Sequence, residues 1–216
     1  MKYLAVLILS IAVTTSNIDE LHNDAKQAFY ASDYTTAITK WQKALDLAKQ
    51  HDNKADISKF LVNLGAVSYS TGKYQAALQY FQQAVFIDQE LNDKNGQSAD
   101  HHYLGLIYYK LQDYKAALQH YQLALTLQAK INISQDSTLS SIGMVYDSIG
   151  AYQQAIKYYK QVSAPPDTIG DASKLSNLGV AYKNLSDYPT ALNYFKKALK
   201  IAKRLGYKTI IANNIT

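Results

Sequence analysis

The feature that most constrains this chain is a pattern of residues that recurs at intervals of 36 to 40 residues. Four segments align without a gap, beginning at Leu64-Gly65, Leu104-Gly105, Ile142-Gly143 and Leu178-Gly179. Each has an aliphatic-glycine pair, a tyrosine nine residues after the glycine, an alanine three residues further on, and an aromatic residue four later. A weaker copy precedes them, with Ala25 at the glycine position. Repetition at such a period is typical of folds that stack similar supersecondary units.

The spacing within each copy predicts two helices joined by a short turn. Ala117, Tyr121 and Ala124 are separated by four and three residues, which places them on one face of a second helix. The aliphatic-glycine pair before them belongs to a first helix, where glycine costs about 1 kcal/mol relative to alanine. We therefore expect a neighbouring backbone to pass close to that glycine. Turn residues such as Thr71-Gly72-Lys73 and Ser186-Asp187 separate the two helices.

Composition agrees with a helical fold and excludes several kinds of chemistry. With 9 glycines and 3 prolines in 216 residues, the chain has too few turn residues for a β-sandwich or barrel. The absence of cysteine excludes a disulfide framework, an iron-sulfur cluster, a thiolate zinc site and a cysteine nucleophile.

These residues resemble the tetratricopeptide repeat family, whose frame is W-x2-L-G-x2-Y followed by A-x3-F and a final proline. The resemblance covers the chain from about Leu21 onward, with leucine or His101 in place of the tryptophan and a longer period of 36 to 40 residues. It implies an all-α fold, a right-handed α-α superhelix or solenoid of five helix-turn-helix repeats plus a partial sixth. The expected repeats are residues 18–57, 58–97, 98–135, 136–171 and 172–208, with the partial sixth at 209–216. That last segment is expected because Ile211 to Ile215 reprises Lys174 to Leu178.

The first sixteen residues predict a signal peptide. Met1 and Lys2 precede an apolar run over residues 3–13, and small residues follow at Thr14, Thr15 and Ser16. Eleven residues are too few to span a bilayer as a helix at ~1.5 Å per residue. We therefore expect residues 1–16 to be removed, leaving an exported array of residues 17–216 in the periplasm or outside the cell. The alternative is a first helix that belongs to the fold of a cytoplasmic or membrane-tethered protein.

In the resembled family the first helices line a concave groove, and the residue two before the frame glycine points towards it. In this chain that position holds asparagine in three of the five copies, at Asn23, Asn63 and Asn177. An amide both donates and accepts hydrogen bonds, so a column of amides can pair with the backbone of an extended peptide. The alternative is that these asparagines bridge adjacent helices. The predicted groove residues are Asn63, Tyr69, His102, Leu106, Tyr109, Asn177 and Lys183.

No catalytic or metal-binding pattern is found in the sequence. The five histidines include no HExxH motif and no pair four residues apart, so no metal ligand set and no cofactor are predicted. The net charge of +5 arises from lysines and a single arginine, Arg204, whereas proteins that read nucleic-acid sequence depend on arginine forks. We therefore expect no nucleic-acid partner and no enzymatic activity.

Two functions remain open from sequence. The first is a non-catalytic scaffold that binds an extended peptide segment of a partner protein in the concave groove. The second is a sensory or regulatory module, covalently continuous with a downstream domain, because arrays with a similar A-I-x-x-W-Q-x-A-L opening resemble those that precede CHAT-type proteases, histidine kinases or nucleotide cyclases.

Overall fold

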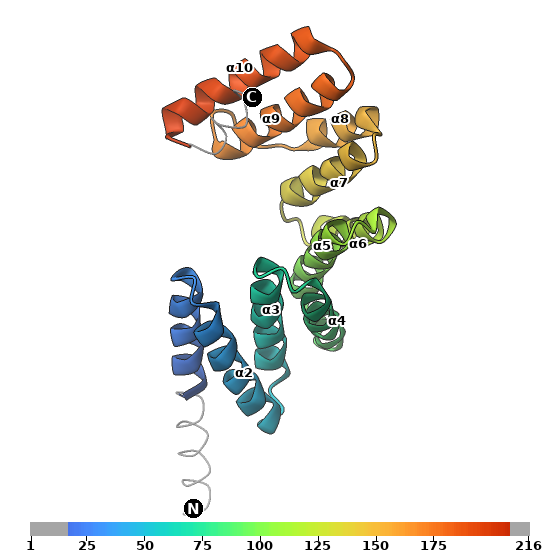
Figure 1. The fold of residues 1–216 in the computed structure, drawn as a ribbon. Coiled ribbons are helices and arrows are strands. Elements are labelled where there is room, and N and C mark those ends of the chain that lie inside the picture. The colour runs from blue at the N-terminus through green and yellow to red at the C-terminus, as the bar shows by residue number, and fades with distance from the viewer. Residues whose placement is uncertain (1–16, 208–216) are drawn as a thin grey trace, which may run out of the picture. The chain divides into compact units, whose positions relative to one another are not determined.

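The computed structural model describes residues 17–207, which form helices and short connections and contain no strand. The chain divides into two compact units, and the boundary along the sequence lies between Leu111 and Gln112. Figure 1 shows the helices of each unit. The predicted all-α fold of consecutive helical hairpins is confirmed over this range. The predicted signal peptide at 1–16 and the predicted partial sixth repeat at 209–216 lie outside the described residues and stay predictions.

The first unit contains a helix over residues 17–30, followed by α2 (Tyr34–Gln50), α3 (Lys54–Ser70), α4 (Tyr74–Glu90) and α5 (Lys94–Lys110). The second unit contains α6 (Tyr114–Lys130), α7 (Asp136–Ser148), α8 (Tyr152–Gln161), α9 (Ile169–Asn184) and α10 (Tyr188–Leu205). The 40-residue period arises from two 17-residue helices and two three-residue connections. The later periods are shorter because α7 and α8 have only 13 and 10 residues, and Pro165-Pro166 follows α8 before another helix can form.

The turn between the two helices of each hairpin has one recurring geometry. Its middle residue is left-handed in all five hairpins of the described chain, at Ser32, Gly72, Gln112, Gly150 and Ser186, with φ between 62° and 77°. An aspartate after it caps the second helix in three of them: Asp33, Asp113 and Asp187 each accept a hydrogen bond from the backbone N–H three residues later. The predicted turns at Thr71-Gly72-Lys73 and Ser186-Asp187 are therefore confirmed.

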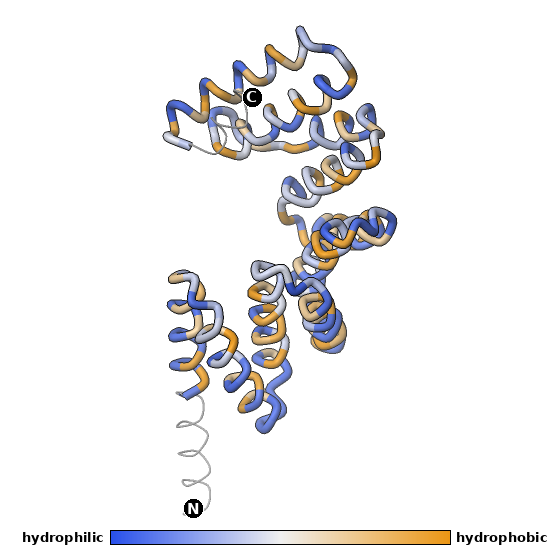
Figure 2. Tube along the Cα trace, viewed as in Figure 1, coloured by the Kyte–Doolittle hydropathy of each residue, from blue (hydrophilic) through white to orange (hydrophobic). Residues whose placement is uncertain are grey.

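Buried side chains of successive helices form the cores. In the first unit, Trp41 and Leu45 of α2 pack with Phe60 and Leu64 of α3 in one cluster. A second cluster joins α4 to α5, and in the second unit a third cluster joins α8 to α9. Figure 2 shows the result most plainly for α3, whose trace is largely hydrophobic because it packs against both α2 and α4.

The frame glycines are explained by aromatic rings, which corrects the expectation of a close backbone. A Cβ atom on Gly65 would lie 2.7 Å from the ring of Phe81, and one on Gly179 would lie 2.5 Å from the ring of Phe195. The ring of Tyr159 occupies the same place beside Gly143. In these three hairpins the aromatic side chain of the second helix therefore rests on the glycine of the first. Glycine is required because any side chain would displace the ring.

We predict that Gly65→Ala lowers the free energy of unfolding by about 1–3 kcal/mol, since the new methyl group overlaps a fully buried ring. Gly170→Ala is the matched control, because its Cβ would meet no ring but only the Ala164 Cβ at 3.2 Å and Thr168 Oγ1 at 3.7 Å. We expect the control to change stability by less than about 0.5 kcal/mol. Urea denaturation of both variants measures the difference, and equal stabilities would contradict the ring-on-glycine explanation.

A buried polar cluster lies where α3, α4 and α5 meet. Ser58 of α3 donates a hydrogen bond to the Asp88 carboxylate of α4, and Asp100 of α5 is fully buried beside them. Burial raises the pKa of Asp100 to about 8, and the nearby carboxyl groups of Asp88 and Asp93 add to the increase. Burial also raises the pKa of Asp88, although the Ser58 hydroxyl opposes this. A protonated Asp100 can donate a hydrogen bond to Asp88, so one proton is shared between two carboxyl groups.

This cluster predicts a pH dependence of stability. Because the pKa of Asp100 is about 8 in the folded chain and 3.8 for an ordinary aspartate, the folded chain binds more protons between these values. Its contribution to stability is fully present below about pH 4 and is lost as the pH rises towards 8. We therefore expect Asp100→Asn to be more stable than the parent chain at pH 8, by about 1–3 kcal/mol, and to depend less on pH.

Thermal or urea unfolding between pH 5 and pH 9 measures this effect. Asp46→Asn, which alters an exposed carboxyl on α2, is the control and should keep the parental pH dependence. An Asp100→Asn variant with the same slope as the parent chain would rule out the shared proton.

Candidate functional site

A pocket of about 300 Å³ lies between the first helices of the first two hairpins. The helix of residues 17–30 forms one side and α3 forms the other, with one residue from α2 at the base. Its lining residues are His22, Lys26, Phe29, Tyr30, Trp41, Lys59, Asn63 and Ala66. The pocket thus contains one of the predicted groove residues, Asn63, together with two lysines and a set of aromatic rings.

Asn63 has a buried polar group that makes no hydrogen bond within the fold. Its Nδ2 atom is buried and has no hydrogen-bond partner among the described residues. Leaving a buried donor unpaired costs about 1–3 kcal/mol, so such groups are rare in folded proteins and need an explanation. The alternative interpretation, in which the asparagine bridges adjacent first helices, would provide a partner for this amide. The structure places it instead in the wall of a pocket.

A hydrogen bond from Trp41 fixes which ring nitrogen of His22 carries a proton. The indole Nε1–H of Trp41 donates a hydrogen bond of 3.1 Å to Nδ1 of His22. Burial lowers the pKa of His22, and the positive charges of Lys59 and Lys26 lower it further, so the imidazole is neutral at pH 7. In a neutral imidazole with Nδ1 as acceptor, Nε2 carries the proton. His22 therefore has a free donor position and no remaining acceptor.

Two ammonium groups complete the polar lining. Lys59 forms an ion pair with Asp56 at 2.5 Å and lies 4.8 Å from the centre of the Phe60 ring. Lys26 lies four residues after His22 on the same helix face and pairs with no carboxylate among residues 17–207. The charge of Lys59 is therefore partly neutralised by Asp56, and the charge of Lys26 is available to a ligand.

The side walls are aromatic. Phe29 contacts both Tyr30 and Trp41, with ring centres 5.9 Å and 5.8 Å apart. Tyr30 is 78% exposed, so it stands at the rim and leaves most of its ring accessible. A ligand in this pocket would meet hydrogen-bond donors, positive charge and flat aromatic surface. That combination suits an acidic side chain whose neighbour in sequence is apolar.

The other predicted residues of the first unit lie on α3 and α5. Tyr69 is half-buried and packs against Tyr74, with ring centres 5.8 Å apart. Burial raises the pKa of Tyr69, and Tyr74, Tyr103 and Tyr109 contribute to the increase, so the structure brings Tyr69 and Tyr109 close together. His102 and Leu106 are half-buried on α5, and burial lowers the pKa of His102, which keeps it neutral. Tyr69 lies on α3, and the other three residues lie on α5, the next first helix.

The remaining predicted residues belong to the second unit. Asn177 is half-buried on α9, at the position that corresponds to Asn63 on α3. Lys183 is exposed in the last turn of α9, where a positive charge also complements the carboxyl end of a helix.

Several pocket residues were not among the predicted groove residues. Lys26, Lys59 and His22 were missed, although His22 and Lys26 hold in the first copy the frame positions that His102 and Leu106 hold in the third. The spacing contains a usable signal, since Lys59 precedes Asn63 by four residues and His22 precedes Lys26 by four. Residues at that spacing share a helix face.

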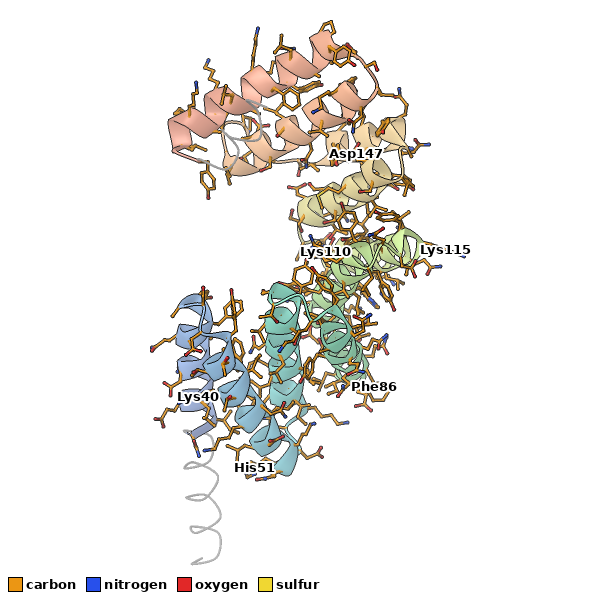
Figure 3. The ribbon with its side chains drawn as sticks, viewed as in Figure 1. Lys40, His51, Phe86, Lys110, Lys115 and Asp147 are labelled. Carbon is orange, nitrogen blue, oxygen red and sulfur yellow. The ribbon has the colours of Figure 1, made fainter. Side chains whose placement is uncertain are left out.

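A second cavity, of about 510 Å³, lies among α2, α3 and α4. Ile57, Leu61 and Ile87 line it, and Phe86 projects from α4 at its edge with 61% of its surface exposed (Figure 3). Its other lining residues are Lys49 and three glutamines. Among the residues that line it, no buried polar atom lacks a partner, so the pocket at Asn63 is the better candidate for a specific site.

Within residues 17–207, no group of three or more histidine, aspartate or glutamate side chains is placed to hold a metal ion. In the same range, no helix is both long and apolar enough to cross a membrane.

Comparison with known families identifies the class of protein. Tetratricopeptide repeat families match residues 97–164 and residues 172–204, and the family of anaphase-promoting complex subunit 5 matches residues 25–108. The chain is a tetratricopeptide repeat protein, and the helical hairpins described above are its repeats. No curated protein sequence matches it significantly.

Solved structures show the same fold at low sequence identity. BtubC (BKLC) from P. vanneervenii is 16% identical, with a TM-score of 0.75 over 91% of this chain and 91% of that chain. A Rap protein complexed with competence and sporulation factor is 15% identical, with a TM-score of 0.78 over 92% of this chain and 57% of that one. The Rap conjugation gene regulator of plasmid pLS20, in complex with the Phr* peptide, is 14% identical with a TM-score of 0.74, over 92% of this chain and 56% of that one.

The unpaired amide leads to a prediction about stability. Replacing Asn63 with leucine, which has a similar shape, removes the buried donor that lacks a partner. We expect Asn63→Leu to raise the free energy of unfolding by about 1 kcal/mol. Asn177→Leu, at the corresponding position on α9, is the control and should gain less, because its amide has no such buried, unpartnered atom. A loss of stability on Asn63→Leu would show that the amide has a partner within the fold.

Proposed function

We propose that this protein is a non-catalytic interaction scaffold that binds an extended segment of a partner protein along its first helices. The pocket at Asn63 would hold an acidic residue of that segment. The observation that carries the proposal is the buried, unpartnered Nδ2 atom of Asn63 in a pocket that Lys26 also lines. An unpaired polar group that lowers the stability of the free protein is explained if a ligand forms the missing hydrogen bond.

The chemistry of the pocket supports a carboxylate as the bound group. His22 Nε2–H, Asn63 Nδ2 and Lys26 are all donors, and a carboxylate accepts hydrogen bonds at two oxygens. Hydrogen bonds to a charged acceptor are shorter and stronger than those between neutral groups. Apolar residues on either side of the acidic residue would contact Phe29 and the exposed ring of Tyr30.

The aromatic surface of α3 and α5 extends the proposed site. Tyr69 lies on α3, which also lines the pocket, and α5, the next first helix, carries His102, Leu106 and Tyr109. A segment that leaves the pocket along the first helices would therefore meet these residues within the first unit. Two of the similar solved structures are Rap proteins with a bound peptide or factor. They support a peptide as the kind of ligand, although their sequences share too little with this chain to transfer a site.

Binding of selected peptides tests this function. We would select ten-residue peptides from a random displayed library on the full chain and measure affinity by fluorescence of Trp41, the single tryptophan, which lines the pocket. We expect the selected peptides to share an acidic residue. Lys26→Glu should weaken their binding about 10- to 100-fold, as expected when a hydrogen bond to a charged group is lost.

Lys115→Glu is the matched control, since it makes the same change of charge on an exposed lysine of the second unit (Figure 3). It should bind the peptides with the affinity of the parent chain. Selected peptides without an acidic residue, or equal binding to the Lys26→Glu variant, would refute the proposed site.

A further inference from the structure

Helix α10 carries the excess positive charge of the chain. It contributes five of the 22 basic residues and none of the 17 acidic ones, so the rest of the chain is formally neutral, with 17 of each. Its basic residues, all exposed, are Lys196, Lys197, Lys200, Lys203 and Arg204. The net charge of +5 is therefore located on this one helix.

Most of these charges are not balanced within the fold. Arg204 pairs with Asp167 at 2.9 Å, whereas the four lysines pair with no carboxylate among residues 17–207. The helix dipole favours Lys203, in the last turn, but it does not account for Lys196 and Lys197. Like charges three or four residues apart destabilise a helix, so the row of lysines needs an explanation other than stability.

The repeat does not require lysine at these positions. Three of the lysines lie 17, 18 and 24 residues after the frame glycine Gly179. The residues at these positions in α4 and α6 are exposed and uncharged: Gln82, Gln83 and Gln89, and Gln122, Leu123 and Ala129. The positive charge is therefore a property of α10 and not of the repeat.

The lysines share their side of the helix with exposed apolar residues. Tyr188 and Leu192 are 64% and 53% exposed. Lys196 and Lys200 follow them at intervals of four residues, which places all four side chains in one row along α10. The opposite side of the helix is buried against the fold, at Ala191, Ala198, Ile201 and Ala202. The exposed side therefore combines positive charge with an aromatic ring and an aliphatic side chain.

We propose that this exposed face of α10 binds the surface of a membrane that contains anionic phospholipids. Lysine is a compact point charge that attracts phosphate groups without a fixed orientation, whereas arginine is the usual choice for a close fit to carboxylates or bases. The apolar stem of lysine lies along apolar surface while its ammonium group stays among polar groups. Tyrosine and leucine suit the boundary between headgroups and acyl chains.

Other polyanions match this face less well. A nucleic acid would contact the lysines but would give Leu192 little apolar surface, and an acidic protein segment is better held by arginine. The binding is peripheral. It does not depend on the proposed peptide site, because the pocket at Asn63 belongs to the first unit and α10 to the second.

Co-sedimentation with lipid vesicles tests this proposal. We would compare vesicles of phosphatidylcholine alone with vesicles in which about a third of the lipid is phosphatidylglycerol. We expect the full chain to bind the anionic vesicles at least about tenfold more tightly, and less tightly as salt is added. Lys196→Gln combined with Lys203→Gln should weaken this binding about 30-fold, as expected when two lysines near a charged surface are lost. Glutamine is the residue of α4 at both positions, so this variant should fold normally.

Lys43→Gln combined with Lys49→Gln is the matched control, since it removes the same charge from exposed positions of α2. It should bind within about threefold of the parent chain. Residues 1–16 are the same in every chain compared, so the comparison isolates α10. Equal weakening of the two double variants, or equal binding of the parent chain to neutral and anionic vesicles, would overturn the proposal.

A fluorescent label distinguishes a lipid surface from other anionic partners. Because the chain has no cysteine, Asn193→Cys provides a single labelling site on the exposed side of α10. We expect an environment-sensitive dye there to shift to shorter wavelength when anionic vesicles are added, and not to shift at the corresponding position of α6, in Gln119→Cys. An unshifted dye at residue 193 would refute contact with lipid. So would binding of polyglutamate or duplex DNA that is tighter than vesicle binding and depends equally on Lys196 and Lys203.

Discussion

The contact on which the regular hairpins depend is that of an aromatic ring with a glycine. In the second, fourth and fifth hairpins the ring of the second helix lies where the first helix has no side chain. This contact fixes the distance between the two helices, because the ring fills the space that a Cβ atom would occupy. The flanking alanines, which are almost fully buried, then allow the next helix to approach. The period, the short turns and the stacking all follow from repeating this one arrangement.

The candidate site lies where the first hairpin departs from that arrangement. Ala25 replaces the glycine, and Trp41 holds the position of the ring. The larger indole donates a hydrogen bond to His22 and lines the pocket that contains Asn63. Trp41 therefore combines the structural position of the frame aromatic residue with a place in the pocket lining. The unpaired amide of Asn63 is tolerated because the buried clusters on both sides of α3 supply the stability of the unit.

The repeat pattern predicted most of the fold but only part of the site. The hairpins and their turns follow from local spacing, so Gly72 and Asp187 could be interpreted without a structure. The reason for the frame glycine could not be inferred from the sequence, because the ring that contacts Gly65 comes from a residue sixteen positions later. Asn63 was predicted from its frame position. Lys26 and Lys59 were missed because they line one pocket only when two helices from different hairpins pack together.

The most direct test of the central claim is a crystal structure of the full chain with a selected peptide bound. The account predicts that a carboxylate oxygen of the peptide lies within about 3 Å of Asn63 Nδ2, with neighbouring peptide residues against Phe29 and Tyr30. A peptide bound instead in the cavity beside Phe86, with the Asn63 amide still unpaired, would contradict it.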